Sequence, residues 1–260
     1  MTTAGIVYFV GAGPGDPELL TLKAHALLRR ADVVLHDDLV APEIVAIAQQ
    51  TAQIVNVGKR CGTKSITQAQ INRLMIDAAA RGIFVLRLKS GDPGVFGRLA
   101  EEISALEAAG IPYEIVPGVT AGIAAAASIG ASLTDRRSSS RVVFLTRHRT
   151  GQNAIHDTED WSAIARDDTT LVIYMPGRDL AALRAELLHA GLPPDFPAVI
   201  VSRATAPNQR EWVTTISALD QAPPVDPPSV LLLGRSLARS LPQSPHQKRF
   251  PRSELVSFPR

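Results

Sequence analysis

The chain has 260 residues, of which 45% are hydrophobic and 20% are charged, with a formal net charge of +2 at pH 7. This length is enough for one or two buried cores, and the near balance of charges excludes a general polyanion-binding surface, so no nucleic acid partner is expected. The single cysteine, Cys61, cannot form an intramolecular disulfide, and neither a signal peptide nor a membrane-length apolar run is present, so we expect a cytoplasmic protein without a membrane partner.

The first half of the chain alternates strand-like apolar runs with helical patterns. Strands are predicted at 6–10, 32–35, 53–57, 83–88 and 113–116. Helices are predicted at 17–30, 67–81, 98–109 and 120–129. The spacing of Thr67 and Gln70 is that of a capping box at the start of the second helix. This βαβα order predicts a largely parallel sheet covered by helices.

The second half is predicted to be a mixed α/β unit with a more antiparallel sheet. Strands are expected at 141–146, 170–175, 198–202, 211–214 and 229–233, and one long helix at 179–189, closed by Gly191. The polar residues 136–140 are the expected linker between an N-terminal domain, 1–135, and a C-terminal domain, 141–238. Pro, Ser, Gln, Lys and Arg dominate after that, which predicts a mobile tail at 239–260.

Two glycine-rich turns follow strand-like runs at residues 10–24 and 87–102, with the sequences VGAGPGDPELLTLKA and RLKSGDPGVFGRLAEE. Glycines permit backbone angles and close approaches that side chains would block, so both turns are expected to bring backbone close to a small ligand. The first turn lacks the third glycine of a dinucleotide fingerprint, and Asp16 places a carboxylate where a pyrophosphate would sit. The pattern therefore disfavours a nicotinamide dinucleotide.

Six segments in order, between about residues 5 and 235, carry a specific resemblance: VGAGPGDPELLTLKA, ADVVLHDDLV, VGKR, SGDPGVFGR, GIPYEIVPGVTAGIAAAA and LVIYMPGRDL. Together they resemble the uroporphyrinogen-III C-methyltransferase family, whose members are S-adenosylmethionine-dependent tetrapyrrole methyltransferases. The resemblance implies a two-domain α/β fold with the cofactor in the cleft between the domains, and a homodimer. It also implies conversion of uroporphyrinogen III to precorrin-2, by methylation at positions 2 and 7, in sirohaem and cobalamin biosynthesis.

The same resemblance implies which residues contact the methyl donor, S-adenosyl-L-methionine. These are Pro14, Ser90, Gly91, Asp92, Val95, Thr120, Ala121, Met175 and Ala204. Two roles stay open for Asp92, because its carboxylate suits a charge-assisted contact with the cofactor but also suits the cap of a tight turn. Met175 either packs against a ligand through its soft thioether or belongs to the core.

A carboxylate-rich tetrapyrrole calls for arginines in the cleft, because the guanidinium group pairs with carboxylates in a bidentate manner. The resemblance places substrate contacts at Arg98 and Arg136, whereas Arg137 is interpreted as a solvated linker charge. Glu101 has three roles open: it orients Arg98, it contacts a pyrrole N–H, or it forms only a surface pair with Arg98.

Methylation of the macrocycle also requires the loss of a proton, for which a base within reach helps. The resemblance assigns a proton acceptor at Asp37 and a proton donor at Lys59. The alternatives are that Asp37 or Asp38 caps a short helix begun by Pro42, and that Lys59 is an ordinary surface lysine. The histidines have no ligand spacing, so no metal site is predicted.

The sequence departs from the family pattern at several positions. Ser90 replaces a glycine, Gly94 stands where an aromatic residue is usual, Leu99 and Ala100 replace a glycine pair, and Asp135 replaces a histidine. We expect Leu99 and Ala100 to add bulk near the substrate and Asp135 to add negative charge there. Two alternative functions follow: a later precorrin methyltransferase of the corrin pathway, or a weakly active paralogue that binds cofactor and tetrapyrrole as a carrier or regulator.

Overall fold

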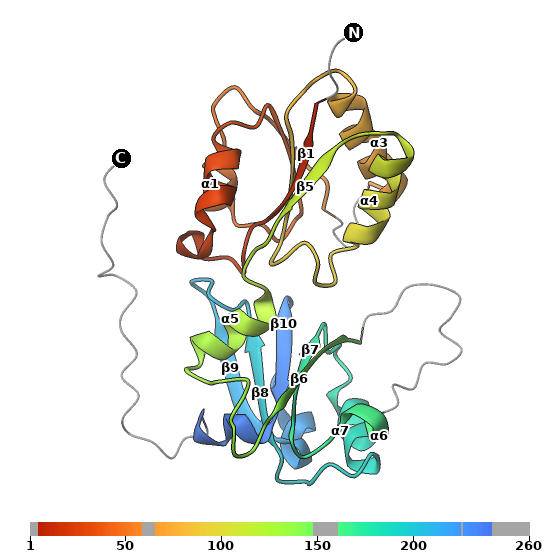
Figure 1. Cartoon of the computed structure of the whole chain (residues 1–260). Helices are drawn as coiled ribbons and strands as arrows, with labels where there is room; N and C mark the ends of the chain where they lie inside the picture. Colours follow the sequence, from red (N-terminus) through yellow and green to blue (C-terminus); the bar gives the residue numbers. More distant parts are fainter. Residues whose placement is uncertain (1–4, 59–65, 148–160, 225, 241–260) are drawn as a thin grey trace.

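The computed structural model describes residues 5–58, 66–147, 161–224 and 226–240 (Figure 1). Lys59 and Cys61 lie outside the described residues. So does the expected tail, apart from residues 239 and 240, which end the 3-10 segment η4 (Arg235–Ser240). The described chain forms two sheets stacked end to end, each covered by its own helices (Figure 1).

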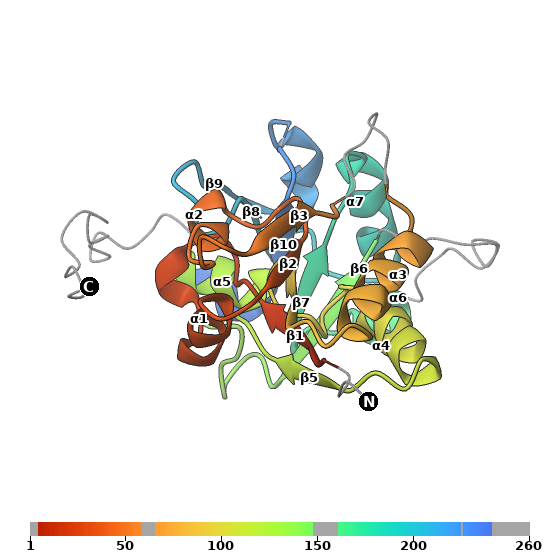
Figure 2. The ribbon, with the colours of Figure 1, turned by 90° about the horizontal axis from the view of Figure 1, so that it is seen from above.

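The first sheet is entirely parallel, with the order β3-β2-β4-β1-β5. Its strands are β1 (Val7–Gly11), β2 (Val33–His36), β3 (Gln53–Asn56), β4 (Val85–Lys89) and β5 (Tyr113–Val116). Helices α1 (Leu22–Leu28) and α2 (Pro42–Val45) cover one face, and α3 (Gln68–Ala79) and α4 (Leu99–Ala108) cover the other (Figure 2). Because the strands are parallel, their carboxyl ends meet at one edge, which confirms the predicted arrangement.

The helix starts follow local capping chemistry. Thr67 and Gln70 form the predicted capping box, in which the Thr67 hydroxyl accepts the Gln70 N–H at 3.2 Å and the Gln70 side chain accepts the Thr67 N–H at 2.7 Å. The continuous helix predicted at 17–30 is wrong. Leu20 is extended, so the segment splits into a 3-10 turn, η1 (Pro17–Leu19), and α1, whose own cap is Thr21.

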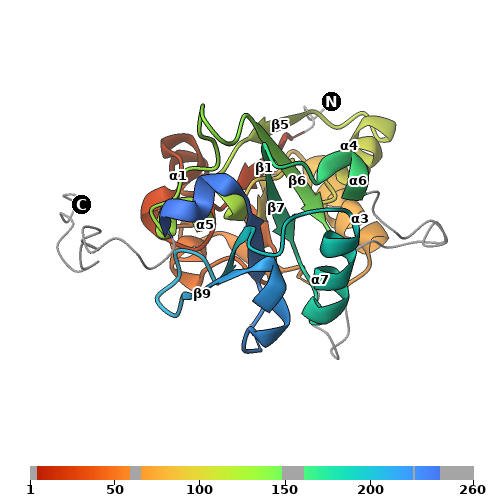
Figure 3. The same cartoon turned by 90° about the horizontal axis from the view of Figure 1, so that it is seen from below.

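The second sheet is mixed, with the order β6-β7-β10-β8-β9, and only its β6 and β7 run parallel to each other. Its strands are β6 (Arg141–Thr146), β7 (Thr169–Tyr174), β8 (Pro197–Ser202), β9 (Arg210–Thr215) and β10 (Ser229–Leu233). Helices α6 (Trp161–Ile164) and α7 (Leu180–His189) lie on one face, and α5 (Ala121–Ser128) lies on the other (Figure 3). The predicted mixed α/β character of this half is confirmed.

Helix α5 packs against the second sheet and not the first. Ala124 and Ala125 are buried with Val172 of β7 and Leu232 of β10 in one hydrophobic cluster. The chain therefore passes from one sheet to the other at 117–120, between β5 and α5, and upstream of the linker expected at 136–140. We propose that the domain boundary lies there, because α5 buries its apolar face only against the second sheet. None of the described helices combines the length and the apolar character that a membrane crossing requires.

Candidate functional site

A cavity of about 390 Å³ lies where the carboxyl edge of the first sheet faces the second sheet. The loops after β1, β2 and β4 and the start of α5 form one side of it. The ends of β7 and β8 and the start of β10 form the other. All nine residues expected to contact the cofactor, from Pro14 to Ala204, line this one cavity. The fold thus brings together positions spread over almost two hundred residues of sequence.

The two glycine-rich turns pair directly at the cavity wall. The Gly13 N–H donates to the Gly91 carbonyl at 3.1 Å, and the Gly91 N–H donates to the Gly13 carbonyl at 2.8 Å. Gly118, in the loop after β5, packs against both turns: a Cβ atom there would lie 2.4 Å from the Gly91 carbonyl oxygen and 2.8 Å from the Gly11 Cα. Three loops therefore meet backbone to backbone, an approach that any side chain at Gly118 would prevent.

Asp92 ties two of these loops together. One carboxylate oxygen accepts the Gly94 N–H at 2.8 Å and the other accepts the Gly118 N–H at 2.9 Å. This geometry gives Asp92 the turn-capping role that the sequence left open. Each carboxylate oxygen can accept a second hydrogen bond, so the turn-capping role leaves room for a contact with the cofactor. That contact stays a prediction.

Ser90 offers a free polar group beside the small residues of the cavity. Its hydroxyl oxygen is buried, and no residue in the described part of the chain forms a hydrogen bond with it. Gly91, Ala121 and Ala204 line the same cavity and leave room for a ligand to approach the backbone. A buried hydroxyl without a partner is costly, so this combination fits a small molecule with polar groups, such as the methyl donor that the resemblance implies.

Tyr174 and Phe96 also line the cavity, and the sequence analysis missed both. The Tyr174 phenol oxygen lies 2.7 Å from the Thr120 hydroxyl and accepts the Gly122 N–H at 2.9 Å. Burial raises the pKa of Tyr174, against the opposing effect of these two hydrogen bonds. The ring of Phe96 packs 4.9 Å from that of Tyr174, so Phe96 brings to the cavity an aromatic group that Gly94 lacks.

Met175 follows Tyr174 directly and lines the same cavity, and its ligand role stays a prediction. Its side chain is 44% exposed although it lines the cavity, so it is not a core residue. Its backbone, like that of Phe96, has a positive φ, of 48° and 53° respectively. Strained backbone at non-glycine residues clusters at binding sites, where the surrounding structure holds it in place.

Asp37, the expected proton acceptor, lies at the cavity wall after β2. Its carboxylate accepts a hydrogen bond from an Arg87 guanidinium nitrogen at 2.5 Å. The alternative that Asp37 or Asp38 caps the helix at Pro42 is wrong, because the cap of α2 is Ala41 and no side chain caps that helix. The expected donor, Lys59, lies outside the described residues.

A buried charge network lies behind Asp37. Glu102, fully buried in α4, accepts hydrogen bonds from Arg87 Nε at 3.0 Å and Lys89 Nζ at 2.6 Å. Burial opposes the charge on Arg87, but the carboxylates of Asp37 and Glu102 outweigh it and raise the Arg87 pKa. For Lys89, burial and then the Arg87 charge lower the pKa. The sequence signal, which was missed, is two cations at alternate positions of an otherwise apolar strand.

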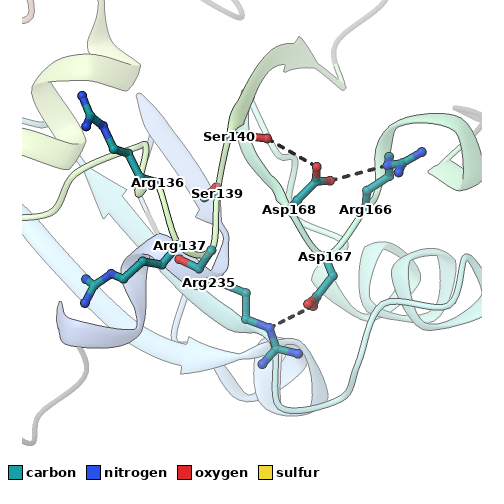
Figure 4. Close-up of a pocket in the computed structure, with 9 residues that line it drawn as sticks. Arg136, Arg137, Ser139, Ser140, Arg166, Asp167, Asp168 and Arg235 are labelled. Carbon is teal, nitrogen blue, oxygen red and sulfur yellow. Dashed lines mark hydrogen bonds and ion pairs between the residues drawn. The ribbon is translucent and has the colours of Figure 1, made fainter.

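The expected substrate residues are not all brought together. Arg98 lines the cavity and forms two hydrogen bonds with Glu101, at 2.7 and 2.6 Å, which raise the Arg98 pKa. Arg136 lies instead in a second cavity, of about 680 Å³, at the opposite end of β7 (Figure 4). Asp168, which lines that second cavity, precedes β7, whereas Met175 follows it. Within one chain, Arg98 and Arg136 therefore lie at opposite ends of the second sheet.

Two of the four arginines that line the second cavity form ion pairs with its two carboxylates. Arg235 pairs with Asp167 at 2.9 Å, and Arg166 pairs with Asp168 at 3.5 Å (Figure 4). Arg136 points away from these two carboxylates in the same view. The positive groups of this cavity therefore do not converge on one anion.

The departures expected to affect the substrate lie off the first cavity. Leu99 packs with the buried core between α3 and α4, and Ala100 is exposed, so neither narrows the cavity. Asp135 forms an ion pair with Arg137 at 2.8 Å, near the second cavity. Leu99 and Ala100 therefore add no bulk to the first cavity and Asp135 adds no charge to it, and their effect on the substrate stays a prediction. Among the described residues, no three His, Cys, Asp or Glu side chains are grouped to hold a metal ion.

Comparison with known proteins gives a family. The family model described as Tetrapyrrole (Corrin/Porphyrin) Methylases matches residues 6–220. The chain is 40% identical over 237 residues to uroporphyrinogen-III C-methyltransferase of Paracoccus denitrificans, a match that covers 90% of this chain and 82% of the relative. It is 41% identical over 236 residues to siroheme synthase of Sodalis glossinidius, covering 90% of this chain and 49% of the relative. The chain thus spans about half the length of the siroheme synthases it matches.

Solved structures give the same result. Uroporphyrin-III C-methyl transferase from Thermus thermophilus, complexed with S-adenyl homocysteine, is 38% identical, with a TM-score of 0.78 over 90% of this chain and 100% of that one. Cobalt precorrin-4 methyltransferase is 31% identical, with a TM-score of 0.79 over 89% of this chain and 95% of that one. Diphthine synthase, at 18% identity and a TM-score of 0.60, shares the fold alone.

Proposed function

Because the chain belongs to the tetrapyrrole (corrin/porphyrin) methylase family, we propose that it is an S-adenosylmethionine-dependent C-methyltransferase that converts uroporphyrinogen III to precorrin-2, by methylation at positions 2 and 7. One observation carries the proposal: the nine residues expected to hold the cofactor, which lie far apart in sequence, line a single cavity between the two sheets. A similar structure was solved in complex with S-adenyl homocysteine, which supports a cofactor of this kind.

The residues of the cavity fit such a cofactor. The backbone of Gly91 and the small side chains of Ala121 and Ala204 allow close packing, and the Ser90 hydroxyl has a hydrogen bond to give. Met175 presents a polarisable surface beside them. When bound, S-adenosylmethionine supplies an electrophilic methyl group on a sulfonium. The chain contributes chiefly by alignment, since methyl transfer requires the attacking carbon, the methyl group and the sulfur to lie in line.

The charged residues of the cavity serve the tetrapyrrole. As the new carbon–carbon bond forms, the carbon–sulfur electron pair stays on sulfur, and the ring gives up one proton for each methyl group gained. Among the three aspartates that line the cavity, Asp37 is the one to which we assign the acceptance of that proton. Arg98 pairs with the exposed carboxylate of Glu101 in this structure. A substrate carboxylate could replace Glu101 in that pair, because a guanidinium group binds any carboxylate in the same bidentate manner. Arg136 contributes only if the macrocycle or its side chains reach the second cavity.

The test is an anaerobic incubation of purified protein with S-adenosylmethionine and uroporphyrinogen III, followed by mass spectrometry of the tetrapyrrole. A product heavier by two methyl groups supports the proposal. Tight binding of both ligands without turnover supports the carrier alternative instead. Turnover of a methylated precorrin, but not of uroporphyrinogen III, supports the later corrin-pathway enzyme. Without binding of any tetrapyrrole, the proposal fails.

Asp37→Asn gives the internal control. This variant should slow turnover while its affinity for S-adenosylhomocysteine stays that of the native chain, because no cofactor-binding role is proposed for Asp37. Unchanged turnover would remove Asp37 from the reaction. We also propose that the protein is a homodimer of the cytoplasm, on the family resemblance. Light scattering during size exclusion tests the dimer, and a monomer over the whole concentration range would refute it.

A further inference from the structure

Arg87 joins the cavity wall to the buried interior of the first sheet. It lies on β4 with almost no exposure, and every nitrogen of its guanidinium has a partner. Nε donates to Glu102 at 3.0 Å, one terminal nitrogen donates to the carbonyls of Leu35 and Leu88 at 3.4 and 3.2 Å, and the other donates to Asp37 at 2.5 Å. Neighbouring strands and a helix thus fix the guanidinium plane, and Arg87 reaches the cavity wall together with Asp37.

The charges of this network balance in pairs. Arg87 and Lys89 are the two cations, and Glu102 and Asp37 are the two anions. Glu102 is fully buried, and it also accepts a hydrogen bond from Gln68 at 3.2 Å. Asp37 is the most exposed member, with 30% of its side chain accessible. Arg87, Lys89 and Glu102 are therefore almost fully enclosed, and Asp37 is the member of the network with an exposed carboxylate at the cavity wall.

Stability alone is a poor reason for such a network. Removing charges from water is costly, so a buried ion pair is often no more stable than apolar residues of the same size. The neighbours of Arg87 and Lys89 on β4 are Val85, Leu86 and Leu88, all apolar and buried, so the strand could have been apolar throughout. What the charges do provide is a guanidinium group of fixed position, one nitrogen of which donates a hydrogen bond to Asp37.

We propose that Arg87 is a positioning residue that holds the Asp37 carboxylate at the cavity wall, and that Glu102 holds Arg87 in turn. This inference rests on the proposed function, in which Asp37 accepts a proton. Arg87 itself does not transfer a proton, because its pKa is raised by the two carboxylates. It acts by restricting Asp37 to one orientation before the substrate arrives, which is the part of catalysis that depends on geometry.

The test is a double-mutant cycle on turnover, with Arg87→Met and Asp37→Asn measured separately and together. If Arg87 acts through Asp37, Arg87→Met should lower kcat about tenfold in the native background and less than about twofold in the Asp37→Asn background. The KM for S-adenosylmethionine should stay unchanged in all variants. Equal losses of kcat in the two backgrounds would overturn the inference. If Arg87→Met does not fold, Arg87→Lys replaces it in the cycle. Lysine keeps the positive charge but lacks the planar set of hydrogen-bond donors of the guanidinium group.

Lys89→Met is the matched control. It removes a buried cation from the same strand and leaves Glu102 with one partner fewer, but the ion pair of Lys89 is with Glu102, whereas Arg87 also pairs with Asp37. Because Lys89 is linked to Asp37 only through Glu102 and Arg87, its loss of kcat should depend on Asp37 less than that of Arg87→Met does. Coupling of Lys89 to Asp37 as strong as that of Arg87 would show a general effect of buried charge and overturn the positioning role. If the native protein transfers no methyl group, the proposed function itself is refuted. Failure of the positioning role and failure of the proposed function are therefore distinguishable.

Discussion

The Tyr174 phenol oxygen accepts a hydrogen bond from the Gly122 N–H at 2.9 Å and thereby ties the end of β7 to the first turn of α5. The same oxygen lies 2.7 Å from the Thr120 hydroxyl, just before α5. A Cβ atom at Gly122 would lie 2.6 Å from the phenol oxygen, so this contact requires glycine. The position of Thr120 and Ala121 in the cavity therefore depends on Tyr174.

We expect Tyr174→Phe to lower the free energy of unfolding by about 1–3 kcal/mol, because the buried groups of Thr120 and Gly122 lose their partner. Affinity for S-adenosylhomocysteine should fall with it. Urea unfolding and calorimetric titration measure the two effects. Tyr113→Phe is the control: its hydroxyl bonds Glu107 at the surface, and its removal should change stability by less than about 0.5 kcal/mol. Equal effects of the two variants would contradict the role of Tyr174.

The raised pKa of Tyr174 gives a pH dependence of known sign. Its ordinary value is 10.0, and burial raises the folded value above that. Below pH 10 the phenol is protonated in both states, and its full contribution to stability is present. As the pH rises above 10, the unfolded chain loses the proton first, so stability falls. The stability difference between native protein and Tyr174→Phe should therefore shrink between pH 9 and about pH 11, and a difference that grows would refute this.

Alanine substitutions at Gly118 and Gly110 distinguish the effect of crowding from the effect of backbone strain. A Cβ atom at Gly118 would collide with the Gly91 carbonyl, whereas at Gly110, with φ of +66°, it would meet nothing within 4 Å. Gly110→Ala should lower stability by about 1–2 kcal/mol, through its left-handed backbone alone. Gly118→Ala should lower it by roughly 3 kcal/mol or more and weaken cofactor binding, because the loops must separate. Thermal unfolding with and without S-adenosylhomocysteine measures both; equal losses would argue against the packed loops.

Asp92→Asn tests the turn-capping role. The carboxylate accepts a backbone N–H on each oxygen, and an amide keeps only one acceptor, so the variant should lose about 1–3 kcal/mol of stability. Asp16→Asn is the control, since one Asp16 oxygen accepts the Glu18 N–H and the change leaves that acceptor in place. A loss of cofactor affinity by Asp92→Asn at full stability would show that its carboxylate serves the ligand instead.

Arg98→Met should weaken substrate binding and leave the stability of the fold unchanged. Its ion pair with Glu101 is exposed, so its removal should change stability by less than about 0.5 kcal/mol. Under the proposed function, the KM for the tetrapyrrole should rise about tenfold while the KM for S-adenosylmethionine stays constant. Arg73→Met, which breaks a comparable exposed pair with Asp77 on α3, should change neither. A substrate KM unaffected by Arg98→Met would remove Arg98 from the site.

Local patterns in the sequence were enough for most of the elements. The apolar runs predicted the strands of both sheets, and the capping box at Thr67 fixed the start of α3. The split of the expected first helix at Leu20 was missed, because Thr21 caps a helix of its own and the pattern of apolar residues continues across the break. The domain boundary expected at 135 also followed polar composition, whereas α5 is placed by its packing on β7 and β10.

The sequence by itself determined the alternation of strands and helices, the two glycine-rich turns and the family resemblance, because each depends on residues close together in the chain. Only the tertiary structure decided which of these positions meet. It paired Gly13 with Gly91, gave Asp37 its buried partner Arg87 and placed Arg136 away from Arg98. Those outcomes depend on strand order and helix packing, which bring together groups that no local pattern relates.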